Sequence, residues 1–163
     1  MLKKVSDVME PIIDTVSPDT TVKNAIMQMR VATRKPGIYG VKGIIVLDAD
    51  GKVIGLLSVR DILRSILPEY MMERTEFGSL SWPGMFEHMA NKISEKTVGE
   101  IMSKEVITIS PEATLMECAV LLIKHNLWRL PVVTPDNRPL GMVYLRDLHY
   151  AIVDSILETE TDK

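Results

Sequence analysis

The hydrophobic and polar positions of this chain predict the same series of elements twice. Each half begins with a short helical turn that ends in Met, followed by an extended segment. A Ser-Pro-acid triplet then predicts a helix start, because a hydroxyl or carboxylate caps free N–H groups and Pro fits the first turn. Two apolar runs with a turn between them predict paired strands, and an amphipathic helix closes the half. The predicted unit is therefore β-α-β-β-α.

The elements lie at matching places in the two halves. An Asp-Gly pair between the strands of the first half is typical of a hairpin. The predicted strands and closing helices are residues 43–48, 53–57 and 60–67 in the first half, and 130–133, 140–144 and 146–157 in the second. The helix before each strand pair has an apolar face formed by Val22, Ala25, Ile26 and Met29, or by Leu115, Ala119, Leu122 and Ile123.

The two halves also match residue by residue. Residues 5–9 align with 98–102 at an offset of 93, and identical residues between 46 and 66 recur at an offset of 86. The first half therefore carries seven extra residues, between about residues 30 and 43. A unit of about 60 residues buries little core alone. We expect two α/β repeats packed through their strands with pseudo-twofold symmetry.

The patterns divide the chain into four parts. These are a first repeat over residues 1–67, a linker with helical segments over 68–93, a second repeat over 94–157 and a tail over 158–163. The linker carries Phe77, Trp82, Phe86 and four Met residues, more apolar mass than a free tether carries. We expect it to pack, either on its own chain or on a second chain.

Composition and charge exclude several classes of protein. The chain has 163 residues with 46% hydrophobic and 25% charged, and its net charge of −3 gives no basic field for nucleic acid or an anionic membrane. No apolar run reaches the ~18 residues of a membrane span, and no signal peptide is visible. Its single cysteine excludes an internal disulfide. We expect a cytoplasmic protein.

The sequence contains no catalytic or metal-binding pattern. It has no Walker A, Gly-x-Ser-x-Gly or His-Glu-x-x-His motif, and its three histidines lack metal-type spacing. Cys118 matches Ala25 on a predicted helix face, which favours a small buried residue over a nucleophile. We therefore expect neither an enzyme nor a metal site.

The most informative motif is the turn that joins the last strand of each half to its closing helix. It reads Gly-Leu-Leu-Ser-Val-Arg-Asp at residues 55–61 and Gly-Met-Val-Tyr-Leu-Arg-Asp at residues 141–147. A carboxylate accepts two vicinal hydroxyls at once, and a hydroxyl beside a helix N-terminus lies where an anion is favoured. The turn therefore suggests a polar ligand. Helix capping, which Asp performs without any ligand, is the alternative.

In this order, the motifs resemble a tandem pair of cystathionine-β-synthase (CBS) domains, the Bateman module. The resemblance covers roughly residues 3–67 and 94–157, and it rests on the turns just described and on the stretches 98–102, 107–112 and 125–133. It implies two repeats in one compact disc, and such discs often pair into homodimers. It also implies binding of AMP, ADP, ATP or S-adenosylmethionine in clefts between the repeats.

The function implied by the resemblance is regulation. We expect a stand-alone sensor that needs no cofactor beyond this ligand, changes shape on binding and signals to an effector protein of unknown identity. The alternative is a scaffold that dimerises without any ligand.

The resemblance also assigns roles to the turn residues. Asp61 and Asp147 would accept hydrogen bonds from ribose hydroxyls, and Ser58 would contact phosphate. Tyr144 stands where the second turn should have a small hydroxyl, and it could fill that cleft, stack on a base or remodel the site. We expect unequal clefts, with Ser58 and Asp61 marking the better one.

Basic residues and two threonines complete the set of candidates. Arg129 stands where the family often places a cation on phosphate, and the first copy has Gly43 there. The enlarged first-copy loop either reaches over the phosphate in place of that arginine or is a solvated basic loop. Its candidate side chains are Arg34, Lys35 and Lys42. Thr15 and Thr108 lie on the extended stretches that line the adenine pocket in relatives.

Overall fold

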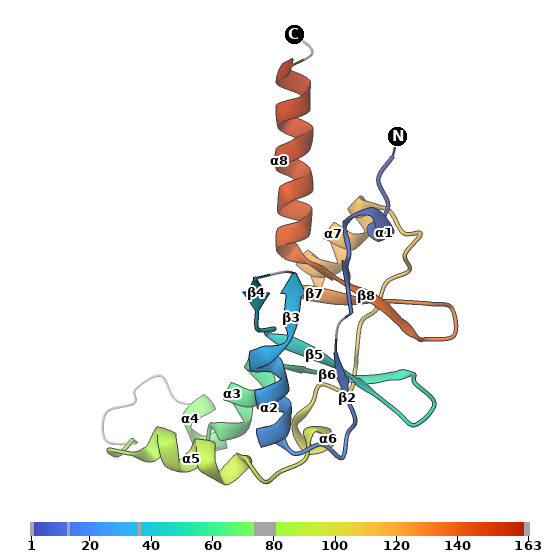
Figure 1. The fold of residues 1–163 in the computed structure, drawn as a ribbon. Helices are drawn as coiled ribbons and strands as arrows, with labels where there is room; N and C mark the ends of the chain where they lie inside the picture. The colour runs from blue at the N-terminus through green and yellow to red at the C-terminus, as the bar shows by residue number, and fades with distance from the viewer. Residues whose placement is uncertain (1, 13, 36, 74–80, 162–163) are drawn as a thin grey trace. The chain divides into compact units, whose positions relative to one another are not determined.

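The computed structural model describes residues 2–12, 14–35, 37–73 and 81–161 of the chain (Figure 1). The helices are α1 (Val5–Val8), α2 (Val22–Val31), α3 (Val59–Ile66), α4 (Glu69–Met72), α5 (Met85–Ile93), α6 (Val98–Ile101), α7 (Leu115–Lys124) and α8 (Leu145–Thr161). The strands are β1 (Glu10–Pro11), β2 (Thr15–Val16), β3 (Thr33–Lys35), β4 (Ile38–Tyr39), β5 (Gly43–Leu47), β6 (Val53–Ser58), β7 (Arg129–Val133) and β8 (Pro139–Tyr144).

The chain folds into two compact units, each a small sheet with helices. The first unit is Ile13–Val106, and the second combines Met1–Ile12 with Ile107–Lys163. Each unit therefore holds the body of one repeat together with the short helix that begins the other repeat. The α/β class predicted from the sequence is confirmed.

The first unit is built on the sheet β2-β5-β6. β5 and β6 form the predicted antiparallel hairpin, with Gly51 at its turn in the left-handed region that glycine favours (φ 80°). β2 joins β5 in parallel. The core between this sheet and its helices is formed by Val16, Ala25, Met29, Ile44, Val46, Leu57 and Val98.

The second unit is built on the sheet β1-β8-β7, in which β1 pairs antiparallel with β8, and the parallel pairing of the first unit is reduced to a bridge between Ile109 and Val132. Its core includes Cys118, which is fully buried, as its match to Ala25 predicted. Burial raises the pKa of the Cys118 thiol to about 11, and the negative charge of Asp147 adds to the shift. The thiol is therefore protonated at neutral pH. α8 continues four residues past the predicted helix end at 157, to Thr161.

The helices α2 and α7 begin later than the Ser-Pro-acid triplets predicted. Thr21 caps α2 by accepting a hydrogen bond from the backbone N–H of Asn24 at 3.2 Å, and Thr114 caps α7 in the same way through Glu117 at 3.1 Å. The triplets form turns instead, because a threonine four residues further on supplies the capping hydroxyl directly before the apolar face.

The short helices α1 and α6 are exchanged between the repeats. We call residues 4–11 and 97–103 the lead-in segments. The N–H of Val5 donates to the carbonyl of Ala113 at 2.9 Å, and the N–H of Val98 donates to the carbonyl of Thr20 at 2.8 Å. Both valines are fully buried. The two bonds occupy equivalent positions of the repeat, so the exchange is reciprocal.

A methionine near the end of each lead-in segment packs on the glycine that begins the strand-to-helix turn of the other repeat. A Cβ added to Gly141 would lie 2.7 Å from Met9 Sδ and 2.8 Å from the carbonyl oxygen of Glu10. A Cβ added to Gly55 would collide with the Met102 side chain, which supplies its three nearest atoms. Glycine at these two positions therefore makes room for the lead-in segment.

The linker packs partly on its own chain. Ile93 of α5 is buried with Val22 and Ile66 of the first unit. Trp82 and Phe86 remain 51% and 63% exposed, so this end of the linker is open to a second chain. Phe77 lies outside the described residues.

We predict that Gly55→Ala lowers the free energy of unfolding by about 1–3 kcal/mol, because the new methyl group meets Met102. Met102→Ala removes the side chain that the new methyl group meets. The double mutant should therefore lose less stability than the sum of the losses in the two single mutants. Urea denaturation of the four proteins measures this coupling.

Gly141→Ala with Met9→Ala is the matched control. Its coupling should be smaller, because the backbone oxygen of Glu10 still blocks the methyl group. Additive losses in the Gly55 series would contradict the packing described here.

Candidate functional site

The first turn holds its serine and aspartate in a buried capping box. The backbone N–H of Ser58 donates to Asp61 Oδ2 at 2.8 Å, and Ser58 Oγ lies 2.9 Å from the same oxygen. Ser58 Oγ also accepts from the N–H of Asp61 at 3.3 Å. Both residues are buried. In this conformation Ser58 caps α3 and Asp61, at the third helical position, completes the capping box, which corresponds to the alternative to ligand binding.

The second carboxylate oxygen of Asp61 faces the exchanged lead-in segment. Ser103 Oγ donates to Asp61 Oδ1 at 2.7 Å, and Arg64 Nη1 lies 3.4 Å from the same atom. Two backbone hydrogen bonds between Ser103 and Leu56 hold the serine there. Sequence reasoning missed Ser103, and the signal was its position directly after the Met of the repeated short helix.

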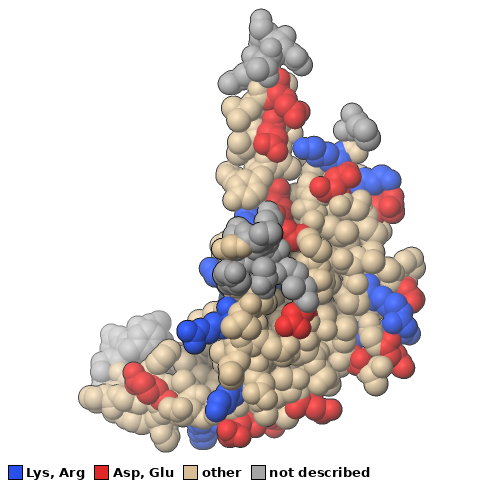
Figure 2. All heavy atoms as spheres, in the orientation of Figure 1, with Lys and Arg blue, Asp and Glu red and all other residues tan. Residues whose placement is uncertain are grey.

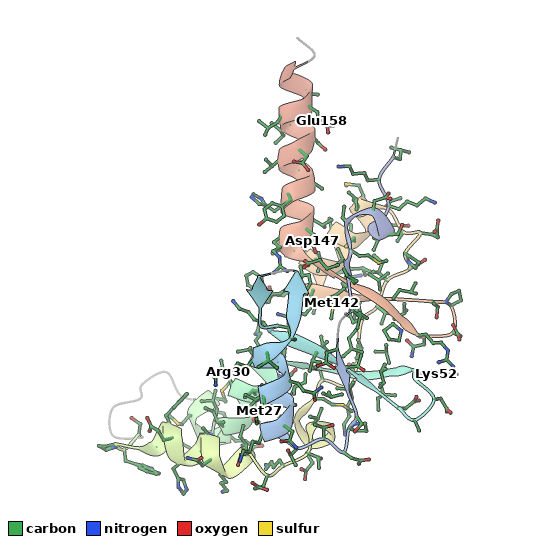
Figure 3. The ribbon with its side chains drawn as sticks, viewed as in Figure 1. Met27, Arg30, Lys52, Met142, Asp147 and Glu158 are labelled. Carbon is green, nitrogen blue, oxygen red and sulfur yellow. The ribbon has the colours of Figure 1, made fainter. Side chains whose placement is uncertain are left out.

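The second turn has the same backbone geometry but different side chains. The N–H of Tyr144 donates to Asp147 Oδ2 at 2.8 Å, which repeats the bond from Ser58 to Asp61. Figure 3 places Asp147 at the start of α8. Arg146 lies over the Tyr144 ring, 4.2 Å from its centroid. Arg146 Nη2 also donates to Glu10 Oε2 at 2.8 Å.

Glu10 is another residue that sequence reasoning missed. It lies on β1, where it pairs with Met142 of β8, and it is buried to 7% exposure. Its position in the repeat is that of Ser103, one residue after the Met. The two lead-in segments thus place a carboxylate beside one turn and a hydroxyl beside the other.

Arg129 lies beside the second turn. It faces Tyr144 across the β7–β8 pair, so the structure brings Arg129, Tyr144 and Asp147 together in the second unit. In the first unit, Gly43 faces Ser58 at the equivalent place. Lys42, next to Gly43, is exposed, and its carbonyl accepts from the N–H of Val59 at 3.0 Å.

The other candidates lie further along the sheets. Thr15 is on β2, which β5 separates from Ser58. Thr108 precedes Ile109, which bridges to Val132 of β7. The enlarged loop forms the antiparallel pair β3–β4. The side chains of Arg34 and Lys35 lie outside the described part of the structure, so their role stays a prediction.

Within the described residues, no three His, Cys, Asp or Glu side chains are grouped to hold a metal ion. Over the same residues, no helix has the length and apolar character needed to cross a membrane.

Comparison with known proteins identifies the family. The CBS domain model matches residues 5–68 and 98–154, which are the two repeats. The chain belongs to the CBS domain family. The fold and family predicted from the turns are therefore confirmed.

Curated relatives of this CBS pair differ in length. Uncharacterized protein MJ1426 of Methanocaldococcus jannaschii is 30% identical over 125 residues, covering 69% of this chain and 74% of that protein. CBSX1 of Arabidopsis thaliana, a chloroplastic CBS domain-containing protein, is 28% identical over 137 residues, which are 80% of this chain and 55% of that protein. The chain matches inosine-5'-monophosphate dehydrogenase of M. jannaschii at 26% identity, over 90% of its own length but only 23% of the enzyme.

Solved CBS pairs share the fold. CBSX2 of Arabidopsis thaliana superposes with a TM-score of 0.69 at 23% identity, covering 94% of this chain and 96% of that one. A structure of CBSX2 in complex with AMP gives 0.65 at 23% identity, covering 93% and 96%. The CBS pair of protein MJ0100, in complex with 5'-methylthioadenosine and S-adenosyl-L-methionine, gives 0.67 at 20% identity, covering 95% and 99%.

We predict that Ser103→Ala destabilises this CBS pair by about 1–3 kcal/mol, because the buried Asp61 carboxylate loses its shortest hydrogen bond. Ser94→Ala is the control: it removes an exposed hydrogen bond within the same unit and should cost less than about 0.5 kcal/mol. Chemical denaturation of both variants measures the difference. Equal losses would show that Ser103 does not support the turn.

Proposed function

We propose that this CBS pair is a regulatory module that binds an adenosine-containing ligand at its strand-to-helix turns and signals the bound state to a partner protein. The ligand would be AMP, ADP, ATP or S-adenosylmethionine. The observation that carries the proposal is the buried carboxylate of Asp61, held beside Ser58 at the start of α3. The complexes of CBSX2 with AMP and of MJ0100 with adenosyl ligands support this class of ligand.

Asp61 is suited to exchange one hydroxyl donor for another. Oδ1 accepts a hydrogen bond from the Ser103 hydroxyl, and a ribose hydroxyl offers the same kind of donor. The exchange keeps the carboxylate hydrogen-bonded, so its burial is not penalised.

The same exchange suggests how binding is signalled. Ser103 ends the lead-in segment that contains α6, so a ligand that replaces its hydroxyl removes the side-chain bond from that segment to Asp61 of α3 and leaves only the two backbone bonds to Leu56 of β6. The free energy that can drive this change is the difference between the ligand's binding free energies for the state with the lead-in segment attached and the state with it released. A partner protein that contacts the lead-in segment would sense this change.

No reaction is proposed for the chain itself. The dehydrogenase relatives are matched over about a quarter of their length or less, so their activity is not transferred.

We predict that AMP, ADP, ATP or S-adenosylmethionine stabilises the protein in thermal unfolding, by about 2.7 kcal/mol at 100 times the dissociation constant. For AMP, ADP and ATP, Asp61→Asn should abolish this ligand-induced gain, and Asp147→Asn should retain most of it. Asp50→Asn, on the exposed hairpin turn, is the control that should change nothing. If none of the four ligands stabilises the wild-type protein, the scaffold alternative is favoured.

Exposed apolar helix faces support homodimer formation as a second property. Met116, Val120 and Ile123 of α7 are 75%, 55% and 73% exposed and share one face at spacings of four and three residues. α7 packs on α8 within the second unit. Exposed apolar side chains that gather on one helix face mark an interaction surface.

The exposed face of α8 is also apolar. At 100° per residue, Tyr150, Ile152, Val153, Ile156 and Leu157 form one arc, away from the buried Leu148 and Ala151. Asp154 and Glu158 fall outside the arc, and Figure 2 shows acidic side chains along one side of the exposed helix. Over residues 150–157, two copies can therefore join their apolar arcs without opposing these acids, which favours a second copy of this chain as the partner.

We predict that Ile156→Asp converts a dimer into a monomer in light scattering coupled to size exclusion, because the arc then carries a charge at its centre. Asp154→Ala, on the acidic side of the same helix, should leave the dimer intact. A wild-type protein that is monomeric throughout would contradict this interface.

A further inference from the structure

The lead-in segments give the two turns different charge. Ser103 and Glu10 hold the same position in the repeat, yet Ser103 donates to the aspartate of its turn, while Glu10 pairs with the arginine of its turn at 2.8 Å. Each contact lies inside one unit. The difference is therefore a property of each turn by itself.

Each turn has an arginine directly before its aspartate. Arg146 of the second turn is held between the buried Glu10 carboxylate and the Tyr144 ring. Arg60, its equivalent in the first turn, is exposed, and no ion pair joins it to any residue in the described part of the chain. One turn thus offers a free guanidinium, and the other has its guanidinium neutralised.

The remaining equivalent positions increase this contrast. Lys42 and Arg64 of the first turn correspond to Trp128 and Tyr150 of the second, and Gly43 corresponds to Arg129. Over these equivalent positions, the first turn has three cations and Asp61, so its formal charge is +2. The second turn has Arg129 and Arg146 against Glu10 and Asp147, so its formal charge is zero.

We propose that the first turn takes an adenosine ligand that bears phosphate, that the second turn takes one without net negative charge, such as adenosine or the sulfonium S-adenosylmethionine, and that Glu10 sets the difference. A phosphate group carries about −1.5 to −2 charge at pH 7 and binds best to unpaired guanidinium groups. A neutral or cationic ligand loses nothing at a turn with zero charge. This assignment rests on the proposed function.

The experiment compares AMP with adenosine, which differ only in the phosphate, by isothermal titration calorimetry. The wild-type protein should bind AMP at one site per chain, and Asp61→Asn should remove that site. Glu10→Gln keeps the size and a hydrogen-bond acceptor beside Arg146 but removes the carboxylate charge. It should strengthen AMP binding at the second turn by about tenfold or more, or create a second AMP site, with adenosine affinity unchanged.

The reverse change tests the same idea on the first turn. Ser103→Glu places a carboxylate on the lead-in segment near the first turn and should weaken AMP binding by about tenfold, whereas Ser103→Gln, of the same size without charge, should not. Melting curves for each variant verify folding. Equal effects of Glu and Gln at position 103, together with no change in Glu10→Gln, would overturn the assignment.

The two proposals fail in different ways. If the wild-type protein binds neither AMP, adenosine nor S-adenosylmethionine, the proposed function fails and this assignment fails with it. If adenosyl ligands bind but the ratio of AMP to adenosine affinity is the same in all variants, only the assignment of ligand charge fails.

Discussion

The reciprocal exchange of the two lead-in segments is the constraint on which the rest of the structure depends. Val5 and Val98 are each fully buried in the unit that holds the body of the other repeat, and their backbone N–H groups bond there. A single repeat of about 60 residues buries little core. The exchange adds one buried valine and a methionine to each core, so each unit contains residues of both repeats.

The exchange also decides the chemistry of the turns. The chain enters each turn at a glycine on which Met9 or Met102 packs, and the residue after that Met then faces the turn. In the first unit this residue is Ser103, which completes the hydrogen bonds of Asp61. Capping of α3, attachment of the lead-in segment and the proposed ligand contact therefore share one carboxylate, so a ligand that engages it must act on the other two.

The two strand-to-helix turns share a backbone conformation but differ in their side chains. The backbone of the two turns is alike, because Ser58 and Tyr144 each donate their N–H to the aspartate three residues later. The side chains around that backbone differ in size and in charge, with Tyr144, Arg146 and Glu10 packed together in the second unit. A common frame with unequal surroundings fits a module that distinguishes related ligands rather than one that binds the same ligand twice.

The sequence by itself determined the repeat, the order of elements, the β5–β6 hairpin and the paired turns, because hydrophobic period, capping residues and an Asp-Gly turn act over a few residues. Only the tertiary structure decided which side chains meet the turns. Ser103 lies 42 residues from Asp61, and Glu10 lies 136 residues from Arg146. These contacts arise because α1 and α6 each pack on the body of the other repeat instead of the body of their own repeat. The local sequence pattern is the same for both packing arrangements. The arrangement therefore depends on how the whole chain buries its apolar residues.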